Sequence, residues 1–230
     1  MSTRPFNDGD PDRWLNPAEA HGGASRRTPT DTSRGPANPA VHEVTKKDPA
    51  EDSGTLPQAL MQVASLRLLA YLKVQRDHYW SQGRGLNDAA RARFGRYFSQ
   101  ELLSKVRVVA LSGSRLKNPW FYEEDHGFGE LDLPSLPHKA SVAYLDLIVF
   151  NDRITDRELF QALVHGAQIH ILGAQAYSEF MVRGVVRTRS YSLIPLRAQA
   201  FALGSRFAAN PEHAFSVEAE VRAWLHQGRY

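Results

Sequence analysis

The sequence predicts an α+β domain, mainly helical with a small sheet, that follows a disordered N-terminal tail. Three observations support this prediction. Residues 1–56 hold seven of the thirteen prolines and almost no large aliphatic side chains. Several segments of residues 57–230 carry apolar residues at the helical period. Two further runs in the same region are rich in apolar and β-branched residues, a pattern typical of strands.

The tail, residues 1–56, is rich in Pro, Gly and Ser, and it lacks the apolar surface that would offset the entropy of ordering it. Its first residues show no apolar core of a signal peptide. No apolar run in the chain approaches the length of a membrane span. The chain has no cysteine, and therefore no disulfide framework and no thiolate site. We expect a cytoplasmic protein without a membrane partner.

Two helices and one strand are predicted at the start of the domain. Residues 56–82 carry apolar side chains at helical spacing, and Pro57 suits a first helical turn. Gly83 is expected to end this helix. Asn87 is a good N-cap, and we predict that it begins a second helix that continues through residue 105. The β-branched run at residues 106–111 predicts a strand.

The middle of the domain combines a long loop, a strand and a central helix. Residues 115–139 contain Pro, Gly and acidic residues throughout, and an irregular loop is expected there. The apolar run at residues 142–150 predicts one strand, which Asn151 and Asp152 should end. Thr155 or Asp156 should cap the following helix, which carries His165. Further helices are predicted over residues 174–187, 195–207 and 217–227.

The segment from residue 159 to residue 207 carries two short patterns. The first contains Leu163-Val164-His165, Gln168 and Leu172-Gly173, and the second contains Ile194-Pro195-Leu196 and Gln199-Ala200. Together they resemble a group of small bacterial zincin-like proteins. In that group a helix of the form L-x-H-E-L-V-H-V-x-Q-Y-x-x-L-G precedes a helix that opens with I-P-L-E-x-Q-A.

This resemblance implies a zincin-like domain over residues 57–230, with a sheet edge beside the active-site helix. It also implies which segments would face a substrate. One is the strand at residues 144–150. The other is the loop at residues 118–122, whose N-P-W-F-Y sequence is similar to a loop of the same group.

Four positions of the resembling proteins carry the chemistry. Two His at i and i+4 bind zinc, the Glu after the first His activates water, and a later carboxylate completes the site. This chain has Gln161, Ala162 and Arg197 at three of these positions and keeps only His165. Gln is a poor zinc ligand, Ala cannot accept a proton, and a permanent Arg cation repels a metal. The resemblance therefore implies a degenerate HExxH motif, with no catalytic residue, bound metal or other cofactor.

A polar stripe surrounds His165 on its helix. Gln161 and Gln168 lie about one turn before and one turn after His165, and Glu158 lies a further turn toward the N-terminus. The other faces of the helix are apolar. Buried polar groups require partners. We expect Arg197 to supply them, either as a structural clasp to Glu158 or Gln161, or by holding a small anion or a peptide. The predicted vestigial pocket consists of Glu158, Gln161, Ala162, His165, Gln168 and Arg197.

The favoured hypothesis is a non-catalytic, zincin-like pseudo-metallopeptidase that acts as a binding or scaffold protein. One alternative is a metal-dependent hydrolase or peptidase with an atypical site around His165. His170 is not expected to share an ion with His165, because a separation of five residues turns the two rings to different sides of a helix. His126 and His138 lie near acidic residues 123–125, but their spacing matches no standard metal site, and a solvated acidic loop is expected.

The second alternative is a nucleic-acid-associated protein with a basic disordered tail. The net charge of the whole chain is +3, which is a small excess spread along the sequence. A nucleic-acid partner is therefore not expected. The sequence does not identify the ligand or partner.

Overall fold

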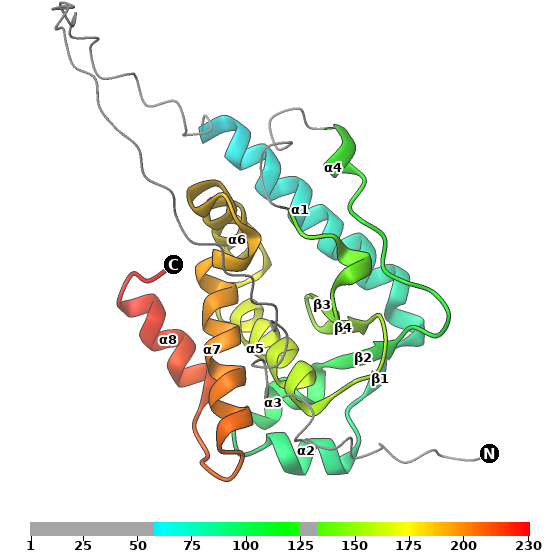
Figure 1. The fold of residues 1–230 in the computed structure, drawn as a ribbon, viewed down its shortest axis with the longest axis vertical. Helices are drawn as coiled ribbons and strands as arrows, with labels where there is room; N and C mark the ends of the chain where they lie inside the picture. Colours follow the sequence, from blue (N-terminus) through cyan, green and yellow to red (C-terminus); the bar gives the residue numbers. More distant parts are fainter. Residues whose placement is uncertain (1–57, 125–132) are drawn as a thin grey trace, which may run out of the picture. The chain divides into compact units, whose positions relative to one another are not determined.

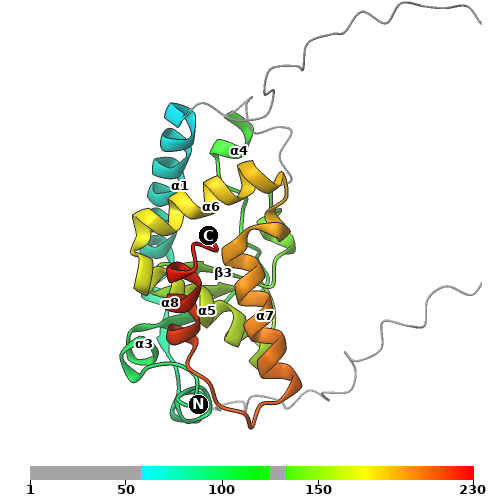
Figure 2. The same ribbon diagram turned by 90° about the vertical axis from the view of Figure 1, so that its left-hand side faces the viewer.

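The computed structural model describes residues 58–124 and 133–230. The predicted tail, residues 1–56, lies outside the described residues. The described residues form a mainly helical domain with a small mixed sheet of four strands, which confirms the predicted α+β class. Figures 1 and 2 show the helices gathered around this sheet and around one central helix, α5.

The first half of the domain contains more breaks than the sequence suggested. The predicted helix over residues 87–105 is wrong, because the chain forms two short helices there. Gly95 ends the first, and the hydroxyl of Ser99 caps the second by accepting a hydrogen bond from the N–H of Leu102. The elements are α1 (Gln58–Tyr79), the 3₁₀ helix η2 (Trp80–Gln82), β1 (Arg84–Gly85), α2 (Asp88–Phe94) and α3 (Gln100–Lys105).

The sheet has the strand order β1-β2-β4-β3, with β2 (Arg107–Ala110), β3 (Ser141–Tyr144) and β4 (Leu147–Phe150). Strands β2 and β4 are parallel, and the other pairs are antiparallel. The prediction of one strand over residues 142–150 is wrong, because this run folds into the β3–β4 hairpin. Leu145 makes the turn at a φ of 61°, and Arg76 of α1 donates two hydrogen bonds to the Asp146 carboxylate beside it.

Strand β3 is an edge strand whose free side follows from the register. Antiparallel pairs alternate between hydrogen-bonded and non-hydrogen-bonded positions. The β2–β4 ladder uses the carbonyls of Asp146 and Phe150, so Leu147 and Val149 direct their backbone groups toward β3. Their partners are Tyr144 and Val142. The backbone N–H and C=O groups of Ser141 and Ala143 therefore face the open edge of the sheet.

The second half of the domain agrees closely with the predicted helices. Thr155 and Glu158 form a capping box at the start of α5, and Gly173 is the single residue between α5 and α6, at a φ of 78°. The predicted irregular loop contains two short helical turns. The elements are α4 (Phe121–Glu124), η3 (Leu136–His138), α5 (Asp156–Leu172), α6 (Ala174–Thr188), η4 (Tyr191–Leu193), α7 (Pro195–Ala209) and α8 (Val217–His226).

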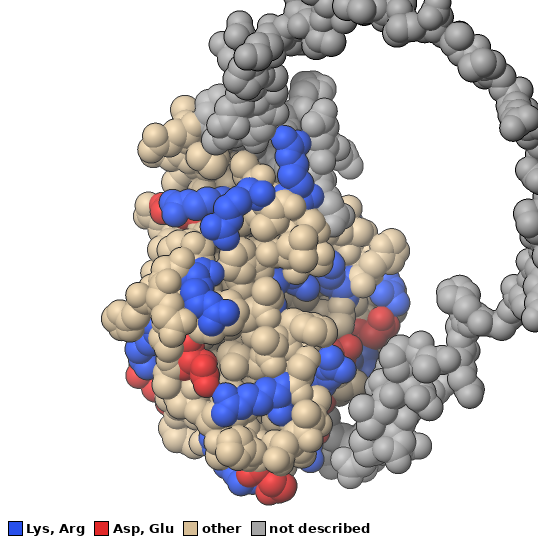
Figure 3. Space-filling view, turned by 60° about the vertical axis from the view of Figure 1, so that its left-hand side comes forward, with Lys and Arg blue, Asp and Glu red and all other residues tan. Residues whose placement is uncertain are grey.

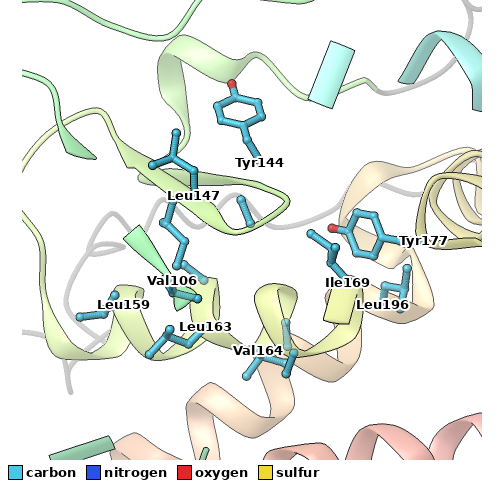
Figure 4. Packing of buried hydrophobic residues seen from close by; sticks show 14 of the residues in the cluster. Val106, Tyr144, Leu147, Leu159, Leu163, Val164, Ile169, Tyr177 and Leu196 are labelled. Carbon is cyan, nitrogen blue, oxygen red and sulfur yellow. The ribbon is translucent and has the colours of Figure 1, made fainter. Parts of the chain in front are cut away.

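The hydrophobic core surrounds α5. Figure 4 shows Leu159, Leu163 and Val164 of this helix among buried side chains from the sheet and from α6 and α7. At one end Phe160 stacks on Phe207 of α7, at a ring distance of 4.4 Å. Because α5 is covered on almost every side, polar groups on it must find partners inside the protein. Among the described residues, no helix combines the length and the apolar character needed to span a membrane.

Helices α5 and α7 approach each other closely at Gly204. A Cβ atom added to Gly204 would lie 2.4 Å from Cγ of Gln161, whereas one added to Gly166 of α5 would meet its nearest neighbour at 3.9 Å. We expect Gly204→Ala to lower the free energy of unfolding by about 1–3 kcal/mol through overpacking. Gly166→Ala should be neutral or stabilise the domain by up to about 1 kcal/mol, because alanine favours a helix.

Urea denaturation of both variants and the wild type measures this difference. Gly166→Ala is the matched control, since it makes the same chemical change within a helix that has room for a methyl group. Equal stability of the two variants would show that α5 and α7 are not packed as closely as described.

Candidate functional site

A cavity of about 170 Å³ opens over α5, and β3, α1, α6, α7 and the segments before β3 form its walls. We call it the His165 cavity. Five of the six residues predicted for the vestigial pocket line it. Gln168 is the exception, because it is fully buried behind His165. The five lining residues are Glu158, Gln161, Ala162, His165 and Arg197.

The tautomer of His165 follows from a chain of hydrogen bonds. Nε2 of Gln168 donates to the backbone oxygen of Leu196 at 2.8 Å and to Oε1 of Gln199 at 2.9 Å. The amide oxygen of Gln168 is therefore the atom that lies 2.8 Å from Nδ1 of His165. An amide oxygen only accepts, so Nδ1 carries the proton and Nε2 is left as an acceptor.

The imidazole of His165 is neutral at physiological pH. Burial lowers its pKa to about 3, the charge of Arg197 lowers it further, and the bond to Gln168 opposes this shift. Among the described residues, Nε2 of His165 has no hydrogen-bond partner. This atom is not counted among the buried atoms without a partner, so it is accessible from the cavity. Since His165 lines the cavity, Nε2 is the acceptor that this ring offers to a ligand.

Arg197, the third residue of α7, has a different partner from the one expected. Its Nη1 donates to the hydroxyl of Tyr191 at 2.8 Å, and its Cζ lies 4.1 Å from the centre of that ring. The expected clasp from Arg197 to Glu158 or Gln161 is therefore wrong. Glu158 is occupied elsewhere, because its carboxylate accepts hydrogen bonds from the backbone N–H and the hydroxyl of Thr155.

No carboxylate of the described residues balances the charge of Arg197. Within residues 58–124 and 133–230, Arg197 forms no ion pair, and its Nε is buried without a hydrogen-bond partner. Lys139 lies close by, with Nζ 4.8 Å from the centre of the Tyr191 ring. Two cations thus lie against the same ring in the cavity wall. A buried or half-buried cation favours a nearby anion.

The buried hydrogen bonds between α5 and α7 come from glutamines instead of Arg197. Gln168 of α5 and Gln199 of α7 are both fully buried and hydrogen-bonded to each other. Gln199 also donates to the backbone oxygen of Glu220 at 3.3 Å and accepts from the Tyr230 hydroxyl. This buried network connects His165 to α7, α8 and the last residue of the chain.

The wall expected from the zincin resemblance is only partly correct. None of the described residues that line the cavity belongs to β4. Ser141, Val142 and Ala143 of β3 line the cavity instead. Of the loop at residues 118–122, Pro119 and Tyr122 line it.

Sequence patterns did not identify three residues that shape the cavity. Tyr191 positions Arg197, and Tyr177 of α6 places its hydroxyl 3.4 Å from Nδ1 of His165. Asn151 is buried, and its amide bonds the backbones of Leu116, Leu136 and Lys139, which fixes the segments before β3. The one sequence signal for these residues was the position of Tyr191, which lies three residues before the second pattern, residues 194–200.

The described residues contain no group of three or more His, Cys, Asp or Glu side chains that could hold a metal ion. His170 is exposed, with Nε2 3.8 Å from a carboxylate oxygen of Glu101. His138 is exposed on η3. Asp125 and His126 of the alternative loop site lie outside the described residues, and the side chains of Glu123 and Glu124 are not described.

The low pKa of His165 predicts acid sensitivity. The unfolded chain binds a proton at this side chain below a pH of about 6.5, and the folded protein binds it only near pH 3. Stability is therefore lost as the pH falls from about 6.5 toward 3. Between pH 6 and pH 4 we expect the free energy of unfolding to fall by about 1 kcal/mol per pH unit more in the wild type than in His165→Gln.

Urea denaturation at a series of pH values tests this expectation. The His165→Gln variant carries all other titratable groups, so subtracting its curve isolates the contribution of His165. Parallel curves for the two proteins would mean that the imidazole titrates normally in the folded state.

Comparison of the chain with known protein families, with curated proteins and with solved structures finds no match. The zincin resemblance is therefore a hypothesis that rests on the motif residues. The chemistry of the His165 cavity has to be inferred from its own side chains. These are two cations, a neutral imidazole that accepts hydrogen bonds, several tyrosines and the free edge of β3.

Proposed function

We propose that this protein is a non-catalytic binding protein, a zincin-like domain without a functional metal site, and that its His165 cavity holds an extended peptide. The observation that carries the proposal is the cation of Arg197. It lines the cavity, yet no carboxylate of the described residues pairs with it. Such a group is stabilised when a ligand brings an acceptor or a negative charge.

The cavity lacks the groups that hydrolysis by a zincin requires. Ala162 stands where a general base would activate water, and its methyl group cannot accept a proton. Among the described residues that line the cavity, Glu158 is the one carboxylate, and it is bonded to Thr155 in the cap of α5. His165 offers one nitrogen as a potential ligand, and Gln161 and Arg197 do not complete a zinc site. Binding without turnover is the activity that these side chains support.

The peptide form of the ligand is supported by the edge of β3. Ser141 and Ala143 line the cavity, and their backbone N–H and C=O groups face away from β4. A free strand edge pairs with an extended peptide through main-chain hydrogen bonds, which provide affinity, while pockets for alternate side chains provide specificity. The edge and the cations lie in one cavity, so a single peptide can contact both.

The nucleic-acid alternative has little support. Residues 1–56 contain more Asp and Glu than Lys and Arg, so the tail is not basic as that alternative assumed. On the face shown in Figure 3, basic side chains are spread out, with acidic side chains between them at several places. Nucleic-acid binding is favoured by basic side chains clustered on one face.

The proposed loss of the metal site leads to a prediction about zinc. Protein purified without chelator should hold no stoichiometric zinc, because Gln161, Ala162 and Arg197 replace two ligands and a base. The triple variant Gln161→His, Ala162→Glu, Arg197→Glu should gain zinc affinity. Both of its His would project from one face of α5, and the carboxylate introduced at position 197 would face them across the same cavity. Competition with a chromophoric chelator measures the affinity.

The Ala162→Glu single variant is the control for nonspecific binding by an added carboxylate. One tightly held zinc per wild-type chain, lost on His165→Ala, would contradict the proposal. A folded triple variant without any zinc affinity would show that the four positions do not correspond to a zincin site.

The proposed peptide binding leads to a prediction about the free edge of β3. A mixture of random ten-residue peptides, passed over the immobilised full chain, should leave a retained fraction that mass spectrometry detects. Ser141→Pro should retain at least about tenfold less, because proline removes an N–H that faces the open edge. Proline is tolerated at the first position of an edge strand, so the fold should persist.

Ser141→Ala is the matched control, because it removes the same hydroxyl and keeps the N–H. It should retain peptides as the wild type does. Absence of any retained peptide, or equal retention by a folded Ser141→Pro, would contradict peptide binding at this edge.

A further inference from the structure

The His165 cavity adjoins a second, apolar cavity. The second cavity measures about 90 Å³, and its walls come mainly from α1, α4, α6 and η4. Tyr191 belongs to both cavities, and so do Leu68, Tyr122, Pro134 and Met181. The polar and apolar spaces therefore form two neighbouring compartments of one site. Val182, Val185 and Ile194 make the second compartment almost entirely hydrocarbon.

Tyr191 places the cations at the junction of the compartments. Its hydroxyl accepts the hydrogen bond from Arg197, and Lys139 lies against its ring. A ligand that fills the apolar compartment therefore passes beside two positive charges. Ligand sites of this kind, with apolar walls and a few convergent polar groups, select ligands that match both parts.

The position of Lys139 also gives the direction of a bound peptide. Lys139 comes two residues before β3 begins, so the cations lie near the first residues of that strand. An added strand that runs antiparallel to β3 ends beside the start of β3. Its C-terminal carboxylate would then reach the cations, whereas a parallel strand would bring its N-terminal ammonium to them and be repelled.

We propose that the site recognises the C-terminus of a partner polypeptide, with the terminal carboxylate at Arg197 and Lys139 and an aliphatic last side chain in the apolar compartment. This inference rests on the proposed function, that the His165 cavity binds an extended peptide. The size of the apolar compartment sets the preference for the side chain. It is smaller than the cavity of about 150 Å³ that accommodates benzene, so Leu or Val fits it better than Trp.

Four N-terminally labelled octapeptides test the proposal by fluorescence anisotropy with the full chain. They share one sequence of alternating Thr and Val and differ only at the end: Leu with a free carboxylate, Leu with an amide, Ser with a free carboxylate, and Trp with a free carboxylate. We expect the first to bind at least about tenfold more tightly than the amide, because the amide loses a charge-assisted hydrogen bond. The Ser and Trp peptides should also be weaker than the first.

Two variants assign the two effects to the two compartments. Arg197→Gln should remove most of the difference between the acid and the amide, while the preference for Leu over Ser remains. Ala64→Phe, which fills the apolar compartment from α1, should remove the preference for Leu over Ser and keep that for the acid. If Ala64→Phe does not fold, the peptide series on the wild type still decides the proposal.

The outcomes separate this proposal from the proposed function. Equal binding of acid and amide would refute capture of a C-terminus. If none of the four peptides binds while random peptides are retained by the wild type and not by Ser141→Pro, the C-terminal assignment is wrong and peptide binding stands. If no peptide of any kind binds, both proposals fail. Octanoate has the same carboxylate and an aliphatic chain, so tighter binding of octanoate than of the Leu peptide would identify a free organic acid as the ligand.

Discussion

The buried amide of Gln168 is the constraint on which the arrangement of the site depends. An amide with no access to water must find partners for its oxygen and its N–H groups inside the protein. Gln168 finds three partners on two helices: His165 on α5, and the backbone oxygen of Leu196 and the side chain of Gln199 on α7. These bonds set the separation of α5 and α7, and they determine which nitrogen of His165 is protonated. The chain needs a glycine at position 204 because the two helices are held this close.

Under the zincin hypothesis, this network takes the mechanical role that a metal plays between two helices. The cost of removing a metal is that its former ligands are left in the interior. Here Gln161 and Arg197 replace two of them, and the remaining His165 is neutral and bonded through Nδ1. Under that hypothesis the cavity would have changed from one that stabilises a bound cation to one that stabilises a bound anion. That reversal of electrostatic preference is the physical basis for assigning it a binding role.

The predictable parts of the fold were those set by local sequence. Thr155 and Pro195 act on the helix that directly follows them, so the starts of α5 and α7 were predicted within about one residue. The β3–β4 hairpin was missed because Leu145 holds a positive φ that usually favours glycine, and an Arg on a distant helix stabilises that turn. Asp146 is the one residue of the run that favours a turn, and the apolar residues on both sides of it predict a continuous strand.

The candidate site shows the same division. Helical spacing brings Glu158, Gln161, Ala162 and His165 of α5 to one cavity. The second sequence pattern adds Arg197, which reaches the same cavity from α7. The partner of Arg197 was not predictable from that spacing. The Glu158 carboxylate could pair with Arg197 of α7 or cap its own helix at Thr155. The structure shows the cap, which joins residues only three positions apart. Lys139 and Tyr191 enter the site through the register of the sheet and the path of η4, which depend on tertiary packing.

Gly173 has a consequence for how a ligand enters. Helices α5 and α6 are joined by this one residue, and they carry His165 on one side of the cavity and Tyr177 and Met181 on the other. The turn at Gly173 holds the start of α6 beside the end of α5, and α6 also packs along α1, so swinging α6 away would expose Tyr177, Met181 and Val185 to water. The helical walls are thus preorganised, and most of the conformational entropy lost on association belongs to the incoming chain. Affinity at such a site is adjusted more by the stiffness of the ligand than by motion of the receptor.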